Sequence, residues 1–484
     1  MKLILEKSKP GRKGVGLPKL DVPRVSAKKA WPKELVRSHQ PKLPQLAEND
    51  VVRHYTNLSR RNYGVDQGFY PLGSCTMKYN PKINEEIAAN CGFGALHPLM
   101  PEYLAQGALE VMFRLEKALC EISGFKHATL QPAAGAHGEL TGIMLIKAYH
   151  RYHGKTNKNV MLVPDSAHGT NPASAVLAGY KIVELPSDDR GNVDIQAFRG
   201  ALNDDVAGIM LTNPSTLGLL EENITEIANS LHERDALLYY DGANLNAVMG
   251  YARPGDMGFD VMHFNLHKTF STPHGGGGPG SGPVAVNEKL VPFLPVPTVE
   301  HRDDHYFLNY DVPMSIGPLM TYYGNFAVML RALVYILRNG AEGLKRVSED
   351  AVLNANYVMQ RLKEVGYTPS FPRRCMHEFV LNNSDKAKKG ARTLDISKRL
   401  LDFGIHPATM YFPLIVKEAM MIEPTETESR ETLDNFIEVM AQINREIDDN
   451  LDLLTQAPHN LPVKRLDDVR ASREPVFRYK PGQE

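Results

Sequence analysis

Short apolar runs alternate with stretches of helical periodicity up to about residue 290, and this alternation restricts the fold more than any other feature of the chain. Strands covered on both faces are continuously apolar. Four runs have this character, at residues 160–163, 207–211, 236–240 and 261–266. Because helices between such strands connect them in parallel, we expect an α/β fold with a mainly parallel sheet. Ligands of such sheets bind at the carboxyl ends of the strands.

The two ends of the chain depart from this pattern. Residues 1–65 are rich in Pro, Lys and Arg and show little periodicity before residue 45, which is typical of an extended arm that wraps a neighbouring chain. We expect a large α/β domain with a bridging helix at residues 66–330, a smaller carboxyl-terminal α/β domain at residues 331–460 and a tail at residues 461–484.

Several elements outside the apolar runs are also predicted. Helical spacing of apolar residues predicts helices at residues 104–122, 322–338 and 431–447, the second ending at Asn339 and Gly340. The Pro-containing segment 292–318 is expected to be an irregular loop near the site or a subunit interface. A strand is expected at residues 378–381.

Lys268 follows the apolar run at residues 261–266 and precedes the glycine-rich segment 275–282. One amine is thereby placed at the end of a predicted strand, where backbone can approach a ligand closely. A lysine amine condenses with aldehydes, and pyridoxal phosphate (PLP) is the aldehyde cofactor that needs one. A solvated loop lysine is the alternative. His267, next to it, is expected either to assist with phosphate or proton transfer or to pack under the loop.

Asp241 is the candidate partner of the pyridine nitrogen of PLP. It follows the strand predicted at residues 236–240 and precedes Gly242, so it lies at the carboxyl end of that strand. An anion there keeps the ring nitrogen protonated and makes the ring an electron sink. An Asp that begins a turn is the structural alternative. Ala243 is small enough for a flat ring to lie against it.

Ala134, Gly135 and Ala136 are the candidate phosphate cradle, because they precede an apolar helical run at residues 140–146. Small residues at a helix start leave backbone N–H groups open to an anion at the positive end of the helix dipole. Gly and Ala also begin helices for packing reasons. Neither this segment nor the glycine-rich segment ends in the Gly-Lys-Ser/Thr of a nucleotide P-loop, which argues against ATP and GTP chemistry.

Three polar residues follow two other predicted strands. His168 comes after the run at residues 160–163, and its imidazole can lie on one face of the pyridine while Ala243 covers the other. A loop histidine more often has a structural role. Thr212 and Asn213 follow the run at residues 207–211 and complete the expected cofactor-binding set.

Charge and residue spacing exclude other classes of protein. The 55 basic and 56 acidic residues give a net charge of −1, so no basic field is available for nucleic acid. The four cysteines form no CxxC pair and the histidines form no His-Glu-x-x-His motif, so we expect no bound metal and a reducing cytoplasm. No stretch approaches the roughly 20 apolar residues of a membrane span, and the first residues lack a signal peptide.

Four longer strings carry a family resemblance: YPLGSCTMKYN at residues 70–80, AHGTNPAS at 167–174, YYDGANLNA at 239–247 and HFNLHKTFSTPHGGGGPG at 263–280. Through them the chain resembles glycine dehydrogenase (decarboxylating), the P-protein of the glycine cleavage system, along its whole length. The order of the site motifs is similar to that of fold-type I PLP enzymes, the aspartate aminotransferase architecture. Single-chain P-proteins are about twice as long, so the chain is similar to subunit 2 of the split form, the catalytic half.

The resemblance implies a reaction and partners. Glycine would lose CO2 on PLP held by Lys268, with Asp241 and His168 in catalytic roles. The aminomethyl group would pass to the oxidised lipoyl arm of H-protein, so that a disulfide accepts the electrons of the CH–NH2 group. The enzyme would be glycine dehydrogenase (aminomethyl-transferring), and it would assemble with subunit 1, two copies of each.

Two alternative functions follow from the same residues. The PLP residues are equally compatible with another PLP-dependent amino-acid decarboxylase of the same fold, or with a non-catalytic interaction subunit. Cys75 is expected to be a buried structural cysteine. Arg373 and Arg374 are candidates for a substrate carboxylate, although a fixed clamp on the group that leaves as CO2 would oppose decarboxylation.

Overall fold

The computed structural model describes residues 2–39, 41, 43–273 and 278–478, and the chain divides into two compact units. One unit combines Met1–Gln67 with Leu466–Glu484, and the other is Gly68–Arg465. Within the described residues, no helix combines the length and the apolar character that a membrane span requires.

A seven-stranded sheet forms the centre of the larger unit, in the order β1-β7-β6-β5-β4-β2-β3. The bonded neighbours from β6 to β3 run parallel and only β7 opposes them, which confirms the expected mainly parallel sheet. The strands are β1 (His127–Thr129), β2 (Val160–Pro164), β3 (Lys181–Leu185), β4 (Val206–Thr212), β5 (Leu237–Gly242), β6 (Val261–Phe264) and β7 (Val284–Val286).

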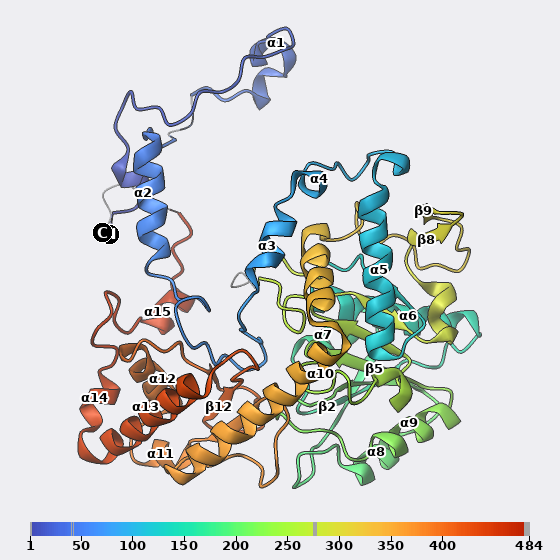
Figure 1. Ribbon diagram of the computed structural model, residues 1–484, viewed down its shortest axis with the longest axis vertical. Coiled ribbons are helices and arrows are strands. Elements are labelled where there is room, and N and C mark those ends of the chain that lie inside the picture. The colour runs from blue at the N-terminus through green and yellow to red at the C-terminus, as the bar shows by residue number, and fades with distance from the viewer. Residues whose placement is uncertain (1, 40, 42, 274–277, 479–484) are drawn as a thin grey trace. The chain divides into compact units, whose positions relative to one another are not determined.

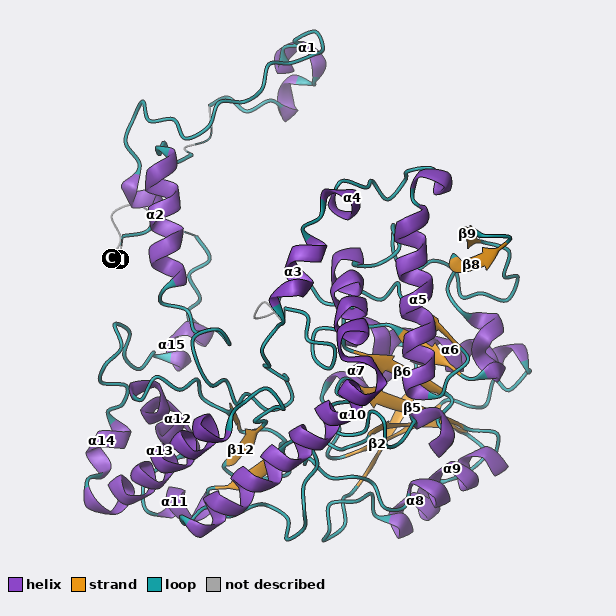
Figure 2. Ribbon diagram, in the orientation of Figure 1, coloured by secondary structure: helices purple, strands orange, loops and turns teal. Residues whose placement is uncertain are grey.

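Helices cover both faces of this sheet, as Figures 1 and 2 show. Successive residues of a strand point to opposite faces, so Tyr239 packs in the core beneath one helical layer and Tyr240 in the core beneath the other. One layer contains α6 (Gly135–Tyr152) and α7 (Thr170–Leu177). The other layer contains α5 (Gln106–Ser123), α8 (Ile195–Ala201), α9 (Ile224–Glu233) and the first part of α10 (Phe326–Glu364).

A second, smaller core lies around an antiparallel sheet in the order β10-β12-β11. Helices α12 and α13 and the second part of α10 pack against this sheet (Figure 1). Phe69 and Tyr367 complete the core. Its elements are β10 (Phe379–Asn382), α11 (Ser384–Lys388), α12 (Thr393–Asp402), β11 (Thr409–Met410), β12 (Ala419–Ile422), α13 (Arg430–Asp449) and α14 (Leu451–Thr455).

The bridging helix differs from the sequence prediction. α10 begins at Phe326 rather than at residue 322 and resumes beyond the predicted stop. Gly340 interrupts it with φ 60° and ψ −175°, a backbone conformation available to glycine, and the helix then continues to Glu364. The stop signal at Asn339 and Gly340 therefore marks a break between two helices, of which the second packs on the smaller sheet.

The segment expected to be an irregular loop contains a β-hairpin. Strand β8 (Thr298–Arg302) pairs antiparallel with β9 (His305–Asn309). Asp303 and Asp304, between them, both have positive φ, as the residues of a tight two-residue turn do. The prediction was wrong because the two strands are short and only partly buried, so the charged tract shows no clear strand pattern.

The smaller unit is mostly exposed and carries few internal contacts. It contains α1 (Ala27–Ala30), α2 (Glu48–Ser59) and α15 (Asp468–Arg473). The Lys9 amide donates to the Gln45 carbonyl at 3.0 Å, and Arg12 forms an ion pair with Asp50 at 2.5 Å. Leu17 is 92% exposed and Trp31, the single tryptophan of the chain, is 61% exposed.

A buried lysine ties the loop at residues 70–80 to the rest of the larger unit. The Lys78 ammonium forms an ion pair with Glu426 at 2.7 Å and donates to the Thr269 carbonyl at 2.8 Å and to Asn246 at 3.1 Å. Burial alone lowers the pKa of Lys78, but Glu426 and the Tyr335 hydroxyl raise it above its ordinary value. The ammonium therefore stays charged and holds the backbone immediately after residue 268.

Replacing Lys78 with methionine is expected to destabilise the chain strongly. The substitution keeps the volume but leaves the Glu426 carboxylate buried without its cation, which costs about 3–5 kcal/mol of unfolding free energy. Urea unfolding followed by circular dichroism measures the loss. Lys389→Met is the matched control, because Lys389 pairs with Asp448 on the surface and such pairs contribute less than about 1 kcal/mol. Equal losses in the two variants would contradict the interpretation.

Candidate active site

A single pocket collects most of the predicted site residues at the carboxyl ends of β4, β5 and β6. Its volume is about 290 Å³. It lies where the parallel strands end, the place at which α/β sheets bind ligands. The pocket is lined by Ser74, Cys75, Gly135, Ala136, Glu139, His168, Thr170, Thr212, Pro214, Thr216, Asp241, Ala243, Asn244, Asn265, His267, Lys268, His377 and Glu378.

Asp241 is buried at the end of β5, with 3% of its surface exposed. The Ala243 amide donates to its carboxylate at 3.0 Å, and the Thr212 hydroxyl lies at 3.4 Å. Burial alone raises the pKa of Asp241, but His263, the Ala243 amide and Lys268 together lower it below its ordinary value. The carboxylate is therefore anionic across the neutral range, as a partner of a protonated ring nitrogen must be.

Lys268 follows β6 in a tightly hydrogen-bonded turn. Its amide donates to the Asn265 carbonyl at 3.0 Å, and the next residue, Thr269, accepts the Leu245 amide at 2.8 Å through its hydroxyl. His267 also lines the pocket, and the Ser281 amide lies 3.4 Å from its Nδ1. The turn is fixed from both sides, so the Lys268 amine is presented to the pocket.

The amino terminus of α6 opens on the same pocket. Ala134 precedes the helix and has no side chain that could cap its first N–H groups, and Gly135 and Ala136 line the pocket. A Cβ on Gly135 would lie 2.6 Å from Oδ1 of Asn265, and Oδ1 is buried without a hydrogen-bond partner. An uncapped helix start, with N–H groups free to donate, fits a phosphate group.

His168 is held by a chain of hydrogen bonds that was not predicted. Its Nδ1 lies 2.7 Å from the Thr170 hydroxyl, which donates to Glu139 at 2.7 Å. The Ser174 hydroxyl donates to the same carboxyl group at 3.2 Å. Burial and then Asp241 raise the pKa of Glu139. A buried glutamate in the first turns of an otherwise apolar helix was the available signal for this residue.

The wall beyond Lys268 contains further residues that the sequence reasoning missed. Ser74, His377 and Glu378 line it, and Glu423 lies directly behind. Cys75 lines it too and is half-buried, so the expected full burial of this cysteine is wrong. Burial, partly offset by Lys268, raises the pKa of Cys75, which keeps it a thiol.

Some predicted residues lie elsewhere. The side chain of Asn213 turns away from the pocket lining and accepts the Glu221 amide at 3.0 Å. Arg373 donates to Asn192 at 2.9 Å and to the Leu220 carbonyl at 2.6 Å, so the structure does not bring it to the pocket. The start of the glycine-rich segment, residues 275–277, lies outside the described residues.

The residues present fit PLP on observations of this structure alone. An amine, a buried anion and an uncapped helix start share one pocket, and His168 and Ala243 both line it beside Asp241. These are the four contacts that a pyridine ring with an aldehyde and a phosphate requires. His168 has a lowered pKa because the surrounding protein desolvates it, so it is a neutral ring.

Sequence comparisons identify related proteins along the whole chain. The family described as "Glycine cleavage system P-protein" matches residues 15–305, and "Glycine dehydrogenase, C-terminal domain" matches residues 347–463. A probable glycine dehydrogenase (decarboxylating) subunit 2 of Caldanaerobacter subterraneus subsp. tengcongensis is 60% identical over 99% of this chain and 98% of that protein. The protein of the same name from Alkaliphilus oremlandii is 56% identical over 100% of this chain and 99% of that protein.

Solved structures of low sequence identity share the fold. A glycine decarboxylase (P-protein) of the glycine cleavage system, in inhibitor-bound form, superposes with a TM-score of 0.74 at 22% identity and covers 85% of this chain and 93% of its own. Glutamate decarboxylase of Lactobacillus brevis has a TM-score of 0.64 at 12% identity, with coverage of 90% and 96%. The fold is that of fold-type I PLP enzymes, as expected.

Proposed function

The chain belongs to the glycine cleavage system P-protein family, and from this premise we propose how its pocket performs the reaction. The chain is a glycine dehydrogenase (decarboxylating) with PLP as cofactor. The observation that carries the residue assignment is that Asp241, buried and anionic, shares one pocket with the Lys268 amine. A decarboxylase acting on another amino acid is not favoured, because relatives at 56–60% identity carry the glycine name.

Each residue has a separate task. PLP, when bound, supplies an electron sink for the electron pair left on the α carbon as CO2 departs. Lys268 would hold the cofactor through its amine, and the first N–H groups of α6 would bind its phosphate. Asp241 would keep a proton on the ring nitrogen, a charge that stabilises the transition state. His168, oriented by Thr170, and Ala243 would contact the ring.

The aminomethyl group passes to a lipoyl disulfide carried by H-protein. The family description places the chain in the glycine cleavage system, and decarboxylation followed by bond formation to sulfur needs a two-electron acceptor. A disulfide meets this need without a nicotinamide. H-protein is thus both the acceptor of the carbon unit and a docking partner.

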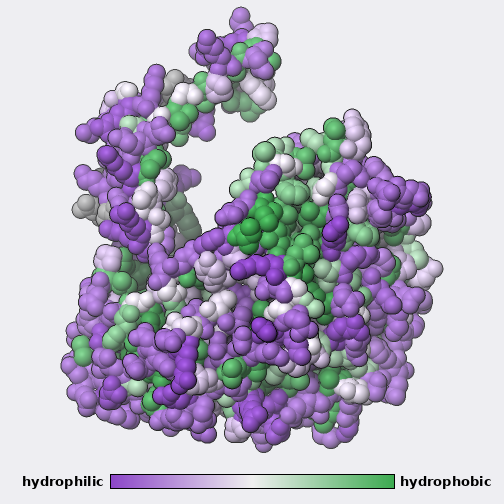
Figure 3. Space-filling view, viewed as in Figure 1, coloured by the Kyte–Doolittle hydropathy of each residue, from purple (hydrophilic) through white to green (hydrophobic). Residues whose placement is uncertain are grey.

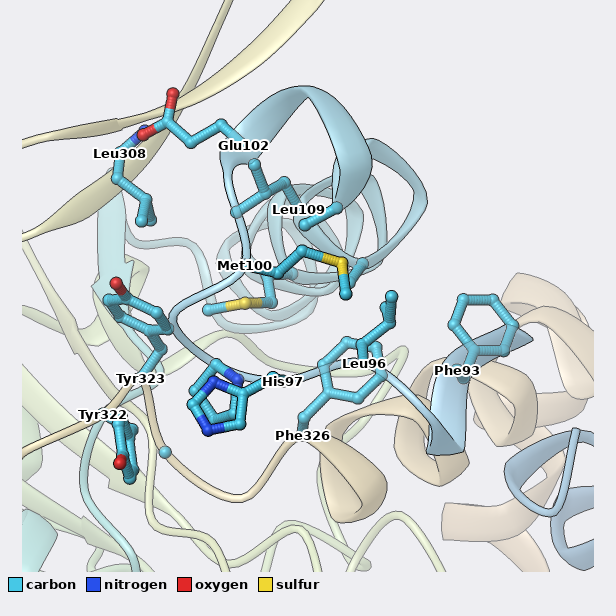
Figure 4. A pocket seen from close by; sticks show the side chains of 15 residues that line it. Phe93, Leu96, His97, Met100, Glu102, Leu109, Leu308, Tyr322, Tyr323 and Phe326 are labelled. Atoms are coloured by element: carbon cyan, nitrogen blue, oxygen red, sulfur yellow. The ribbon is translucent and has the colours of Figure 1, made fainter. Parts of the chain in front are cut away.

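A partner subunit completes the enzyme, as the name subunit 2 of the relatives implies. A hydrophobic surface is available for it (Figure 3) on the face that carries α3 (Lys82–Ala88), α4 (Cys91–Gly94), α5 and the start of α10. In Figure 4, Met100, Leu109, Tyr322 and Tyr323 surround a cavity of about 120 Å³ in this surface. An exposed apolar surface of this kind is typical of a protein interface.

The amino-terminal arm offers a second contact with a neighbour. Leu17, Leu20 and Trp31 are exposed apolar side chains in it. Obligate interfaces bury about 2,000 Å² or more, and we propose that each of these two surfaces contributes to contacts with neighbouring chains. We place two copies of this chain and two of subunit 1 in the complex.

The chain alone is expected to decarboxylate glycine poorly. Release of CO2 from carboxyl-labelled glycine should require this chain, subunit 1 and lipoylated H-protein together, and omission of any one should reduce the rate at least about tenfold, because each supplies part of the site or the acceptor. Size-exclusion chromatography with light scattering measures the masses. Unlipoylated H-protein is the matched control. A stable monomer with full activity would refute the partner proposal, and the absence of labelled CO2 from the complete mixture would refute the function.

A further inference from the structure

Two buried glutamates meet behind the wall of the active site and have no role in the reaction as described above. Glu378 is 4% exposed and lines the pocket, and Glu423 is fully buried. An oxygen of each and a ring nitrogen of His377 all lie within 4.8 Å of one another. Two carboxylates so close together cannot both remain ionised in a buried place without a large cost, so one of them holds a proton.

Hydrogen-bond donors identify which carboxyl group is ionised. Glu423 receives three donors: the Thr76 amide at 3.0 Å, the Thr76 hydroxyl at 2.7 Å and the Asn244 amide at 2.8 Å. Glu378 accepts one described hydrogen bond, from the Ser74 amide at 2.7 Å to Oε2. Burial raises the pKa of Glu423 to about 7, but these donors stabilise its negative charge, so Glu423 ionises before Glu378 and Glu378 is the neutral acid.

Oε1 is the oxygen of Glu378 that is available to hold the proton. Oε2 is engaged by Ser74, whereas Oε1 lies 3.7 Å from Nε2 of His377. Burial, and then Glu423, raises the pKa of Glu378 well above its ordinary value, with Lys268 opposing. The charged or titratable groups that face it are Glu423, His377, Lys268, Cys75 and Cys375.

His377 indicates that this wall receives a polar group. Neither of its ring nitrogens has a hydrogen-bond partner within the described structure, although the residue is only 2% exposed. Burial and Lys268 lower its pKa to about 3, so it is neutral and has one donor and one acceptor to offer. A buried polar ring without a partner is costly, and a bound substrate atom would satisfy it.

A metal ion is the less suitable occupant of this cluster. Within the described residues, Glu423 accepts hydrogen bonds from N–H and O–H donors, which a cation would have to displace. Lys268, whose positive charge acts on Glu378, Glu423 and His377 alike, would repel it. A proton retained on Glu378 displaces no donor of Glu423 and brings no second cation next to Lys268.

We propose that Glu378 is the acid that protonates the sulfur released when the lipoyl disulfide opens. This inference rests on the proposed transfer to a cyclic disulfide. The electron pair left on the α carbon forms the new C–S bond, and the S–S bond breaks with its pair on the second sulfur. The carbon is oxidised by two electrons and the disulfide is reduced. The Oε1 proton of Glu378 goes to that second sulfur, and solvent later restores it.

Glu378→Gln removes the proton but keeps a carbonyl oxygen to accept the Ser74 amide. In the isolated chain without substrate, the infrared difference spectrum at neutral pH between the wild type and the variant should show the loss of one protonated-carboxyl component. In the complete mixture, aminomethyl transfer should slow about 10²- to 10⁴-fold, the usual contribution of a general acid. The absorbance change on glycine binding should persist, because the PLP contacts are intact.

The wild-type transfer rate should fall as pH rises through the pKa of Glu378, since its acid form is then lost. The pH–rate profile of the variant should lack this falling limb. Glu221→Gln is the matched control, because Glu221 is also buried, accepts backbone amides and has a pKa raised by burial, yet lies outside this pocket. Its rate should equal that of the wild type.

An unchanged infrared band, or a transfer rate within about threefold of wild type, would overturn the assignment. If Glu378→Gln does not fold, Glu423→Gln provides the test, because loss of the neighbouring charge should shift the pH limb downward, and an unmoved limb would overturn it. If the wild-type mixture releases no CO2, the proposed function fails instead, and the infrared measurement still determines whether Glu378 is protonated.

Discussion

Lys268→Ala is expected to abolish turnover while leaving the chain folded. The substitution removes the only amine that lines the pocket among the described residues, and loss of a covalent attachment point costs on the order of 10⁴-fold or more in rate. The backbone of the turn is unaffected, since its bonds to Asn265 and Leu245 do not involve the lysine side chain. The α6 cradle remains, so PLP should still bind, but more weakly.

Borohydride reduction of the PLP-loaded chain followed by peptide mapping measures the attachment directly. The pyridoxyl group should appear on the peptide that contains His267, Lys268 and Thr269, and should be absent from the alanine variant. Lys181→Ala, on the exposed first residue of β3, is the control and should keep both the label and the activity. A label on any other lysine would disprove the assignment.

Asp241→Asn is expected to reduce kcat by about 10²- to 10⁴-fold, which corresponds to roughly 3–5 kcal/mol of barrier. Asparagine keeps the shape and can still accept the Ala243 amide, so the change isolates the charge. Without the anion the ring nitrogen loses its proton, and the electron pair on the α carbon loses its stabilisation. The pKa of Asp241 is lowered in the native chain, so the charge is present above that pKa and is lost only as pH falls through it.

Kinetics with saturating glycine and H-protein measure this effect, and the absorption spectrum verifies that PLP is still bound. Asp194→Asn is the matched control, because Asp194 caps α8 on the surface and should change the rate little. Turnover close to wild type in Asp241→Asn would show that the carboxylate only orders the turn after β5, and the ring nitrogen would then need another partner.

Local sequence patterns predicted much of the fold and the two central residues of the candidate site. The apolar runs form β2, β4, β5 and β6. These strands could be predicted because a strand buried on both faces needs a continuous run of apolar residues, which is visible in the sequence. Asp241 and Lys268 could be predicted as site residues for the same reason, since each lies just after such a run and parallel strands end at one edge.

Residues with a role that depends on distant segments could not be found in this way. Glu139, Glu378 and Glu423 lie far apart in the sequence, and each is an ordinary glutamate until the two sheets are placed beside one pocket. Conversely, Asn213 follows a predicted strand as Thr212 does, yet its side chain is drawn to the Glu221 amide. A strand end predicts where a residue lies but not which neighbour its side chain meets.

The sequence by itself determined the parallel α/β architecture, the amine and the anion, because hydrophobic periodicity and turn chemistry act over a few neighbouring residues. Only the tertiary structure decided the break at Gly340, the hairpin at Asp303 and Asp304 and the glutamate pair at Glu378. The glutamate pair arises because β10 pairs with β12 so that Phe379 lies opposite Ile422, and the second helix after Gly340 is held by packing on the smaller sheet. Burial and charge there arise from the neighbours rather than from the residue itself.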